Sequence, residues 1–578
     1  MSSSVVSGTG SLLRIEEALV SEAAERGSDE REALLPLPLA PAQDSEIGNG
    51  LSTSRSLLAF MAPALLAGII VKAFDIAFLS TSYARIASDL NHFKDASWVV
   101  LTDSICSAMF VPLYSYLLKS LGMKRMIFVA YGSFAFGIGL CAISTSFGEL
   151  LGSRLVVGLG SSGITLLSMI IINEIVGMKQ LAIWESFVTC IEMATSMAAG
   201  PLGASMYRRF TWHSVFYLEL AFSILGLVVL SFSFANIKSH PQHAQSVLAK
   251  KGDSRVPRID VEGWLLLVLA VCTPLIALTL GDNFLDWTHP IEILLLVSSP
   301  IFMFLFVLFE SKAAKAPMFD MKPIFKIPYL RVLLQVFFVI SIFNSILSIT
   351  PPYIQVRAFD GPSFEDWALT CVFLGFPAGA ILGGYLAKAE TLSVPRIMLA
   401  NAALLQLSCV LYLTRAIKPE SARYSPLLFA FGFCIGIWQS CLLYATLSTT
   451  QKQWWPQTLA MYYLVETFGA DLGTSMMSTI TRSVAKSGIR SSLGNSPETE
   501  RIITEAMQNL QSVRLLDEKS RAQVLSAFEH AMHTSFFLPC AMAAAVVFLA
   551  ASMNMFPVGK TGHELTSEDH EHGDGRNT

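Results

Sequence analysis

The chain is a succession of long apolar segments, each closed by a charged residue, a proline or a short polar loop. One of them, from Gly263 to Leu280, contains no charged residue and has an acidic residue close to each end. A helix needs about 20 such residues to cross the hydrocarbon core of a bilayer. A sliding window of about 19 residues finds about fourteen segments of this kind. We therefore expect an all-α polytopic membrane protein.

The composition excludes several other classes of protein. Charged residues make up 15% of the chain, against about 25% in a soluble domain. A net charge of −4 indicates no surface for nucleic acids. The nine cysteines all fall within apolar segments and form no CxxC pair, so neither a disulfide framework nor a metal site is expected. No GxxxxGK[ST] or HExxH motif is present, which argues against an ATP-driven pump and a membrane enzyme.

The basic residues predict how the chain is oriented. The expected spans are 57–84, 96–118, 124–145, 149–176, 182–206, 214–236, 262–282, 290–310, 327–356, 366–387, 394–415, 424–447, 455–482 and 533–555. Lys and Arg are about twice as frequent in the short loops after even-numbered spans, which predicts that both termini are cytoplasmic. The polar stretch 485–530 would then lie on the opposite side. Its apolar residues recur at helical spacing from Ile502 to Leu516, so we expect one or two amphipathic helices there.

Several acidic residues lie inside the expected spans: Asp75, Asp103, Glu192, Glu466 and Asp471. A carboxylate at membrane depth is costly unless it faces a cavity or a partner. Several such acids with few basic partners indicate proton binding, a cationic substrate, or both.

Three motifs in the first half form a linked set. The first span ends in AFDIAFLSTSYARIASDL, with Asp75 at its acidic position and Lys72 one turn earlier, where it could pair with the carboxylate. The fourth span contains GSRLVVGLGSSG, which places Arg154 inside the membrane. The fifth contains TSMAAGPLGA, with Gly200, Pro201 and Gly203; this combination bends a helix and admits a close neighbour.

These motifs resemble those of the major facilitator superfamily, in particular its fungal branch with fourteen helices. That branch contains drug:proton antiporters and vacuolar basic amino acid transporters. The resemblance implies a major facilitator fold of two six-helix bundles plus two extra helices. The implied organisation is a disordered cytoplasmic N-terminus (1–55), an N-terminal bundle (56–236), a cytoplasmic loop (237–261), two additional helices (262–310), a C-terminal bundle (327–555) with the non-cytoplasmic loop 485–530, and a disordered cytoplasmic tail (556–578).

The resemblance also implies roles for individual residues. Asp75 and Arg154 would manage proton coupling, while Asp103 and Glu192 would line or border the cavity. The stretch TPPYIQVRAF resembles a family pattern and places Tyr353 and Gln355 on the substrate path. Asn344 is expected on the same path. Gly200, Pro201 and Gly203 match the motif that the family links to antiport.

The loop after the second span departs from the family. PLYSYLLKSLGMKRM resembles the gating pattern PLxGxLxDxxGRK, which Gly122, Lys124 and Arg125 match. Ser115 stands in place of a glycine and Lys119 in place of the aspartate that normally pairs with cations across the cytoplasmic gate. The usual gating network is therefore in doubt, whereas the fold is not.

The function expected from these features is secondary active transport. The leading hypothesis is a plasma-membrane antiporter, working as a monomer in the lipid bilayer, that exports a small organic molecule such as a secondary metabolite, toxin or drug. It would use the proton gradient and no cofactor. The second hypothesis is a vacuolar importer of basic amino acids, to which the acidic dileucine pattern of Glu30, Leu34 and Leu35 adds weak support. The third is a receptor or sensor that no longer transports.

Overall fold

The chain forms two units, Met1–Arg55 and Ser56–Thr578, and the second contains the helices that concern function. The computed structural model describes residues 44–90, 92, 95–176, 178–236, 260–281, 288–312, 318–319, 324–357, 365–389, 393–414, 424–450, 454–494, 496–508, 513–514 and 516–555. The predictions made for residues 1–43, for most of the cytoplasmic loop and for the tail fall outside the described residues.

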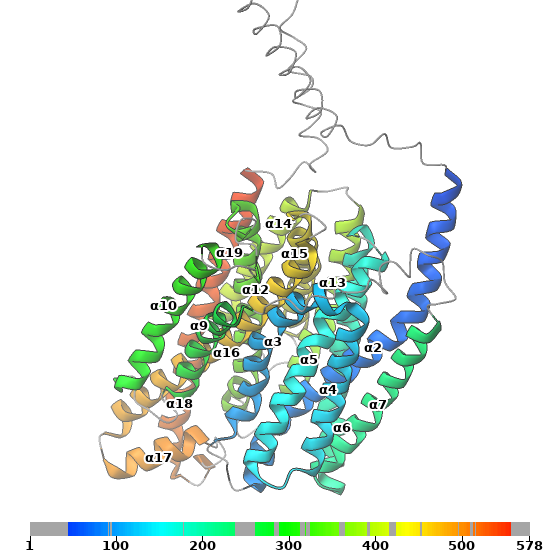
Figure 1. The fold of residues 1–578 in the computed structure, drawn as a ribbon. Coiled ribbons are helices and arrows are strands. Elements are labelled where there is room, and N and C mark those ends of the chain that lie inside the picture. The colour runs from blue at the N-terminus through cyan, green and yellow to red at the C-terminus, as the bar shows by residue number, and fades with distance from the viewer. Residues whose placement is uncertain are drawn as a thin grey trace, which may run out of the picture. The chain divides into compact units, whose positions relative to one another are not determined.

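The N-terminal bundle is built from consecutive long helices (Figure 1). These are α2 (Asp44–Asp89), α3 (Ser97–Leu121), α4 (Met123–Ile143), α5 (Phe147–Val176), α6 (Met178–Arg209) and α7 (His213–Asn236). Their packing joins segments far apart in the chain: the Tyr131 hydroxyl of α4 donates to the Ala64 carbonyl of α2 at 2.8 Å. The rings of Phe78 in α2 and Phe216 in α7 meet edge to face. α2 is thereby fixed against both helices.

The C-terminal bundle repeats this arrangement. Its long helices are α12 (Ile327–Arg357), α13 (Glu365–Ala389), α14 (Val394–Leu413), α15 (Ser425–Ser448), α16 (Trp455–Leu493) and α19 (Phe537–Met555). α13 carries glycines at every fourth position, Gly375, Gly379 and Gly383, along the face that meets α15. A Cβ at Gly379 would lie 1.9 Å from the Phe433 carbonyl oxygen. Small residues at this spacing let the two backbones come into direct contact, as is common between helices in membranes.

Two further helices lie between the bundles in the chain, α9 (Val261–Leu280) and α10 (Pro290–Lys312). α9 packs on α3 and on α16, so it touches both bundles, whereas α10 packs mainly on α9. The Trp264 indole of α9 donates to the Met109 carbonyl of α3 at 2.7 Å. Large apolar side chains of α10, such as Leu294 and Phe304, are exposed, as expected for a surface that faces lipid.

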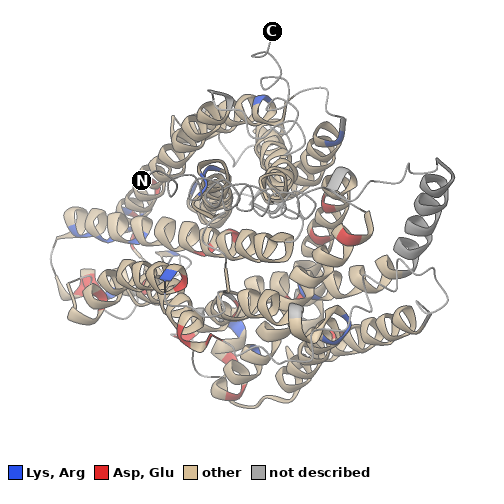
Figure 2. Ribbon diagram, turned by 45° about the horizontal axis from the view of Figure 1, so that its top comes forward, with Lys and Arg blue, Asp and Glu red and all other residues tan. Residues whose placement is uncertain are grey.

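Twelve segments of the described chain are long and apolar enough to cross a membrane. α6 and α16 are not among them, although they span 32 and 39 residues. Both carry acidic and hydroxyl side chains along their length, including Glu185, Glu192 and Glu466. Adding them gives the expected count of about fourteen. Figure 2 displays how few charged residues interrupt the helices elsewhere.

The helices that we expected in the stretch 485–530 are present. α16 continues to Leu493, beyond its expected end at residue 482, and α17 (Pro497–Gln508) and α18 (Glu518–Ser535) follow at the same end of the bundle (Figure 1). Arg490 of α16 donates two hydrogen bonds to the Glu500 carboxylate of α17, at 2.7 and 3.1 Å. This hydrogen bond from Arg490 holds the pKa of Glu500 below its usual value.

Candidate functional site

The strongest polar contact inside the membrane joins α2 to α5. The guanidinium of Arg154 donates to both carboxylate oxygens of Asp75, at 2.8 and 2.9 Å. The Arg154 and Asp75 side chains are only 2% and 1% exposed. A planar fork facing a carboxylate is the strongest geometry for such a pair. The structure therefore brings together the two residues that the motifs singled out, from positions 79 residues apart.

The expected pairing of Lys72 with Asp75 is wrong. The Lys72 ammonium donates instead to the Thr165 hydroxyl of α5, at 2.5 Å. Residues three apart are neighbours on a helix surface, but Asp75 already receives both donors of Arg154. Lys72 is thus left to act elsewhere.

A second buried carboxylate lies beside Asp75. Glu219 of α7 is 2% exposed, and its charge acts on both Asp75 and Arg154. Neither Glu219 oxygen has a hydrogen-bond partner among the described residues. We call Asp75, Arg154 and Glu219 the buried triad. The triad places two carboxyl groups and one guanidinium in a buried environment, where net charge is strongly disfavoured.

Asp103 of α3 lies at the edge of this triad. It is half-buried and accepts a hydrogen bond from the Ser161 hydroxyl of α5 at 3.3 Å. Its charge also acts on Asp75 and Arg154. Asp103 thus belongs with the triad, and it connects α3 to the same face of α5.

The motif glycines set how closely these helices approach. A Cβ at Gly160 would lie 2.4 Å from the Phe134 backbone nitrogen of α4, and one at Gly203 would lie 2.4 Å from the Phe78 ring of α2. Gly203 therefore holds α6 against α2 one turn from Asp75. Gly200 has more space, with its nearest neighbour at 3.9 Å, and Pro201 is exposed.

A second polar cluster lies where the two bundles meet. Glu185 and Glu192 come from α6, and Gln439 and Glu466 come from α15 and α16. The Gln439 amide donates to the Glu466 carboxylate at 3.0 Å, and the three carboxylates act electrostatically on one another. The charge of Lys72 acts on Glu192 and Glu466. We call these five residues the seam cluster.

The seam cluster lies near the middle of the membrane. Glu192 is 14 residues from the start of α6 at Met178, or roughly 21 Å at 1.5 Å per residue. Glu466 is 11 residues from the start of α16 at Trp455, or roughly 17 Å. The hydrocarbon core is about 30 Å thick. Both carboxylates therefore sit at a depth where water reaches them only through the protein.

The two bundles touch tightly beside this cluster. The Ser186 hydroxyl of α6 lies 2.6 Å from the Ala380 carbonyl of α13 and 3.0 Å from the Ser440 hydroxyl of α15. A Cβ at Gly384 would lie 2.5 Å from the same Ser186 oxygen. Ser186 is closer than Glu192 to the predicted cytoplasmic end of α6. The structure thus has its bundles in contact on that side of the seam cluster.

The expected substrate-path residues of α12 are placed differently. Tyr353 is buried in the C-terminal bundle, with its ring edge against Phe536 at 5.8 Å, because α18 and α19 cover this part of α12. Gln355 is exposed. Asn344 is half-buried and donates to the Ile340 carbonyl of its own helix at 3.0 Å.

The gating loop forms a single tight turn. Gly122 has a φ of 80° and separates α3 from α4, a backbone conformation that favours glycine. The Lys124 ammonium lies 5.8 Å from the centroid of the Phe234 ring, and Arg125 is exposed. Ser115 is buried, while the side chain of Lys119 lies outside the described residues.

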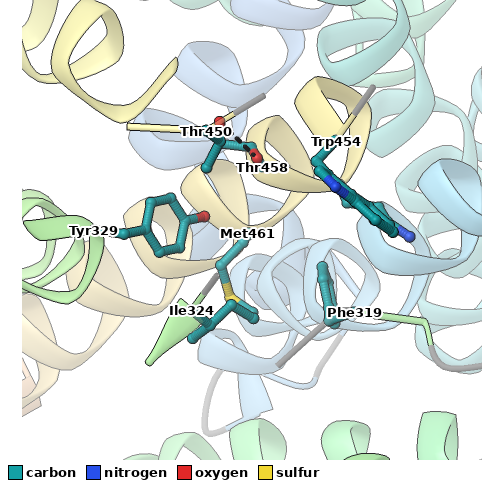
Figure 3. A pocket seen from close by; sticks show the side chains of 8 residues that line it. Phe319, Ile324, Tyr329, Thr450, Trp454, Thr458 and Met461 are labelled. Carbon is teal, nitrogen blue, oxygen red and sulfur yellow. Dashed lines mark hydrogen bonds between the residues drawn. The ribbon is translucent and has the colours of Figure 1, made fainter. Parts of the chain in front are cut away.

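A small cavity opens near the predicted cytoplasmic ends of α12 and α16 (Figure 3). Aromatic and neutral polar side chains line it: Phe319, Ile324, Tyr329, Thr450, Trp454, Gln457, Thr458 and Met461. The hydroxyls of Thr458 and Thr450 lie 3.2 Å apart. With a volume of about 20 Å³, the cavity has room for a water molecule. It is too small to be the substrate site in this state.

Long helices in two bundles that meet across a polar seam at mid-membrane define a secondary transporter. The family model of the Major Facilitator Superfamily matches residues 65–474, and the chain belongs to this family.

The relatives and a solved structure agree with this assignment. The chain is 26% identical to the vacuolar membrane amino acid uptake transporter fnx2 of Schizosaccharomyces pombe, over 86% of this chain and 83% of that protein. It is 22% identical to the multidrug resistance protein fnx1 of the same yeast, over 86% and 92%. The human organic anion transporter MFSD10 (TETRAN) shares the fold with a TM-score of 0.53 at 13% identity, over 86% of this chain and 99% of that one.

Proposed function

We propose that this transporter moves a small organic molecule out of the cytoplasm in exchange for protons. The observation that carries the proposal is the separation of two acidic centres. The buried triad lies within one bundle, whereas the seam cluster draws on both bundles. A proton can be held in the first while a larger molecule occupies the second. No cofactor besides the proton gradient is needed.

α2 provides a route by which the two centres can be coupled. It carries Asp75 of the triad and Lys72 of the seam cluster, three residues apart. Protonation of Asp75 would weaken its bond to Arg154, since the neutral acid no longer attracts the guanidinium as an ion. α2 could then shift against α5, and Lys72 would move with it relative to Glu192 and Glu466. Substrate binding at the seam would favour the reverse change.

Two membranes fit this function. Export across the plasma membrane agrees with the multidrug resistance relative, and we keep it as the leading proposal. Uptake into the vacuole agrees with the name of the fnx2 relative and with the acidic character of the seam cluster. In both cases the substrate leaves the cytoplasm while protons enter it, so the same mechanism serves either membrane.

Location and direction can be tested together. The chain, fluorescently tagged, is imaged in a fungal host that otherwise lacks it, and metabolites are profiled inside and outside the cell. Fluorescence at the cell surface, together with a compound that cells without the transporter retain inside, supports export. Signal on the vacuole with depleted vacuolar lysine or arginine favours the importer. A receptor without transport activity predicts no flux of any compound.

A further inference from the structure

The charges of the seam cluster do not balance. Glu185, Glu192 and Glu466 supply three carboxylates, and Lys72 supplies the one basic group of the cluster. Gln439 donates an amide hydrogen to Glu466, which orients that carboxylate without neutralising it. The cluster therefore has more capacity for positive charge than its own lysine provides.

Unused acceptors point to a ligand with several N–H donors. Glu185 is 5% exposed, and its Oε2 atom has no hydrogen-bond partner among the described residues. The buried hydroxyl of Tyr462 likewise has no hydrogen-bond partner among the described residues. A buried carboxylate oxygen without a partner is costly. An ammonium or guanidinium group would satisfy it.

Lys72 is a cation that acts on the carboxylates of the seam cluster from a neighbouring position. One of its hydrogens is given to Thr165 at 2.5 Å, while its charge acts on Glu192 and Glu466. An ammonium on a flexible four-carbon stem can move away without any change in the backbone. Lys72, Glu192 and Glu466 are all half-buried, in contrast to the fully buried triad. These three side chains are therefore less enclosed than Asp75.

We propose that the seam cluster binds the ammonium or guanidinium group of a cationic substrate, and that Lys72 is a tethered cation which the substrate displaces. This inference rests on the proposed transport function and adds the chemical class of the substrate and a residue that sets its affinity. Lys72 weakens the binding of every cation, because its own positive charge already offsets part of the negative potential of the carboxylates.

The test is equilibrium binding to the purified full-length chain, without a proton gradient. The probes are radiolabelled agmatine, L-arginine and L-citrulline; in citrulline an uncharged ureido group replaces the guanidinium of arginine, while the α-ammonium and carboxylate groups are the same. We expect both cations to bind at least about tenfold more tightly than citrulline. Lys72→Met should tighten cation binding about tenfold, because a like charge is removed, whereas Lys72→Arg should leave it near the wild-type value. Glu466→Gln should weaken it about tenfold.

Thermal unfolding of each variant verifies that its fold is intact, and Lys72→Arg keeps the charge if Lys72→Met does not fold. Equal binding of arginine and citrulline, no binding of either cation, or no tightening in Lys72→Met overturns the proposal. Cation binding without pH-driven uptake would refute antiport and leave the site standing. Uptake of a neutral compound driven by pH, without cation preference, would refute the site and leave antiport standing.

Discussion

The buried triad makes a specific prediction about which single changes the protein tolerates. Arg154 has two carboxylates within reach, Asp75 at 2.8 Å and Glu219 beside it. If Asp75 becomes asparagine, Glu219 can take over as the anionic partner of Arg154. The cost of Asp75→Asn should therefore be about 1–2 kcal/mol, near that of a lost charged hydrogen bond. Glu219→Gln alone should cost less than about 1 kcal/mol, since neither Glu219 oxygen has a hydrogen-bond partner among the described residues.

The free energy of unfolding lost in the double variant should differ from the sum of the losses in the two single variants. Asp75→Asn with Glu219→Gln leaves Arg154 buried without any anion of the triad. Opposite charges about 4 Å apart are worth about 4 kcal/mol at an effective dielectric constant of 20, and removing one partner of a buried pair costs about 3–5 kcal/mol. We expect the double variant to fall in that range. With central values of about 1.5 and 0.5 kcal/mol for the single variants and about 4 kcal/mol for the double variant, the excess over additivity is about 2 kcal/mol.

The assay is reversible unfolding in mixed SDS and dodecyl maltoside micelles, followed by the loss of helical circular dichroism. Arg125→Gln, at an exposed site, is the control and should stay within about 0.5 kcal/mol of the wild type. Additive effects of the two carboxyl substitutions, within about 0.5 kcal/mol, would refute the shared use of Arg154.

Two further predictions concern packing and the helices beyond α16. Gly379→Val should destabilise the fold by more than about 3 kcal/mol, because its Cβ would lie 1.9 Å from the Phe433 carbonyl oxygen. Gly132→Ala is the control and should be neutral, because a Cβ there has no atom within 4 Å. Thermal unfolding in detergent compares the two variants, and equal melting temperatures would contradict the close contact of α13 with α15. Arg490 lowers the pKa of Glu500 below its ordinary value of 4.5. The pairing of the two side chains therefore stabilises α17 fully above about pH 4.5, and this stabilisation is lost as the pH falls through the lowered pKa. Hydrogen exchange in α17 should accordingly be unchanged between pH 7 and 5 once corrected for intrinsic rates, and faster only at more acidic pH; acceleration already at pH 6 would argue against this contact.

The sequence was most informative where a motif fixes a contact. The positions of Asp75 and Arg154 were both apparent from their motifs, and the structure brings them together across two helices. The pairing of Lys72 was mistaken because proximity along one helix competes with partners on another. Only the packing of α5 decides that Arg154 reaches Asp75 and that Thr165 receives Lys72.

Glu185 and Glu219 were overlooked, although both are charged residues inside apolar segments. That signal was present in the sequence, but their partners depend on how each helix is rotated about its axis. Periodicity does not determine rotation when a helix is apolar all round. The polar character of α6 and α16, by contrast, is readable directly and marks the helices that supply the carboxylates of the seam cluster.

The most direct test of proton-coupled transport is proton flux in proteoliposomes containing the full chain and a pH-sensitive dye inside. L-arginine or the compound found by metabolite profiling is added to vesicles with an acidic interior. Wild-type protein should release protons in step with substrate uptake, and Asp75→Asn should abolish this release while still exchanging labelled for unlabelled substrate. Full proton release by Asp75→Asn, or substrate uptake by the wild type without proton movement, would contradict the account.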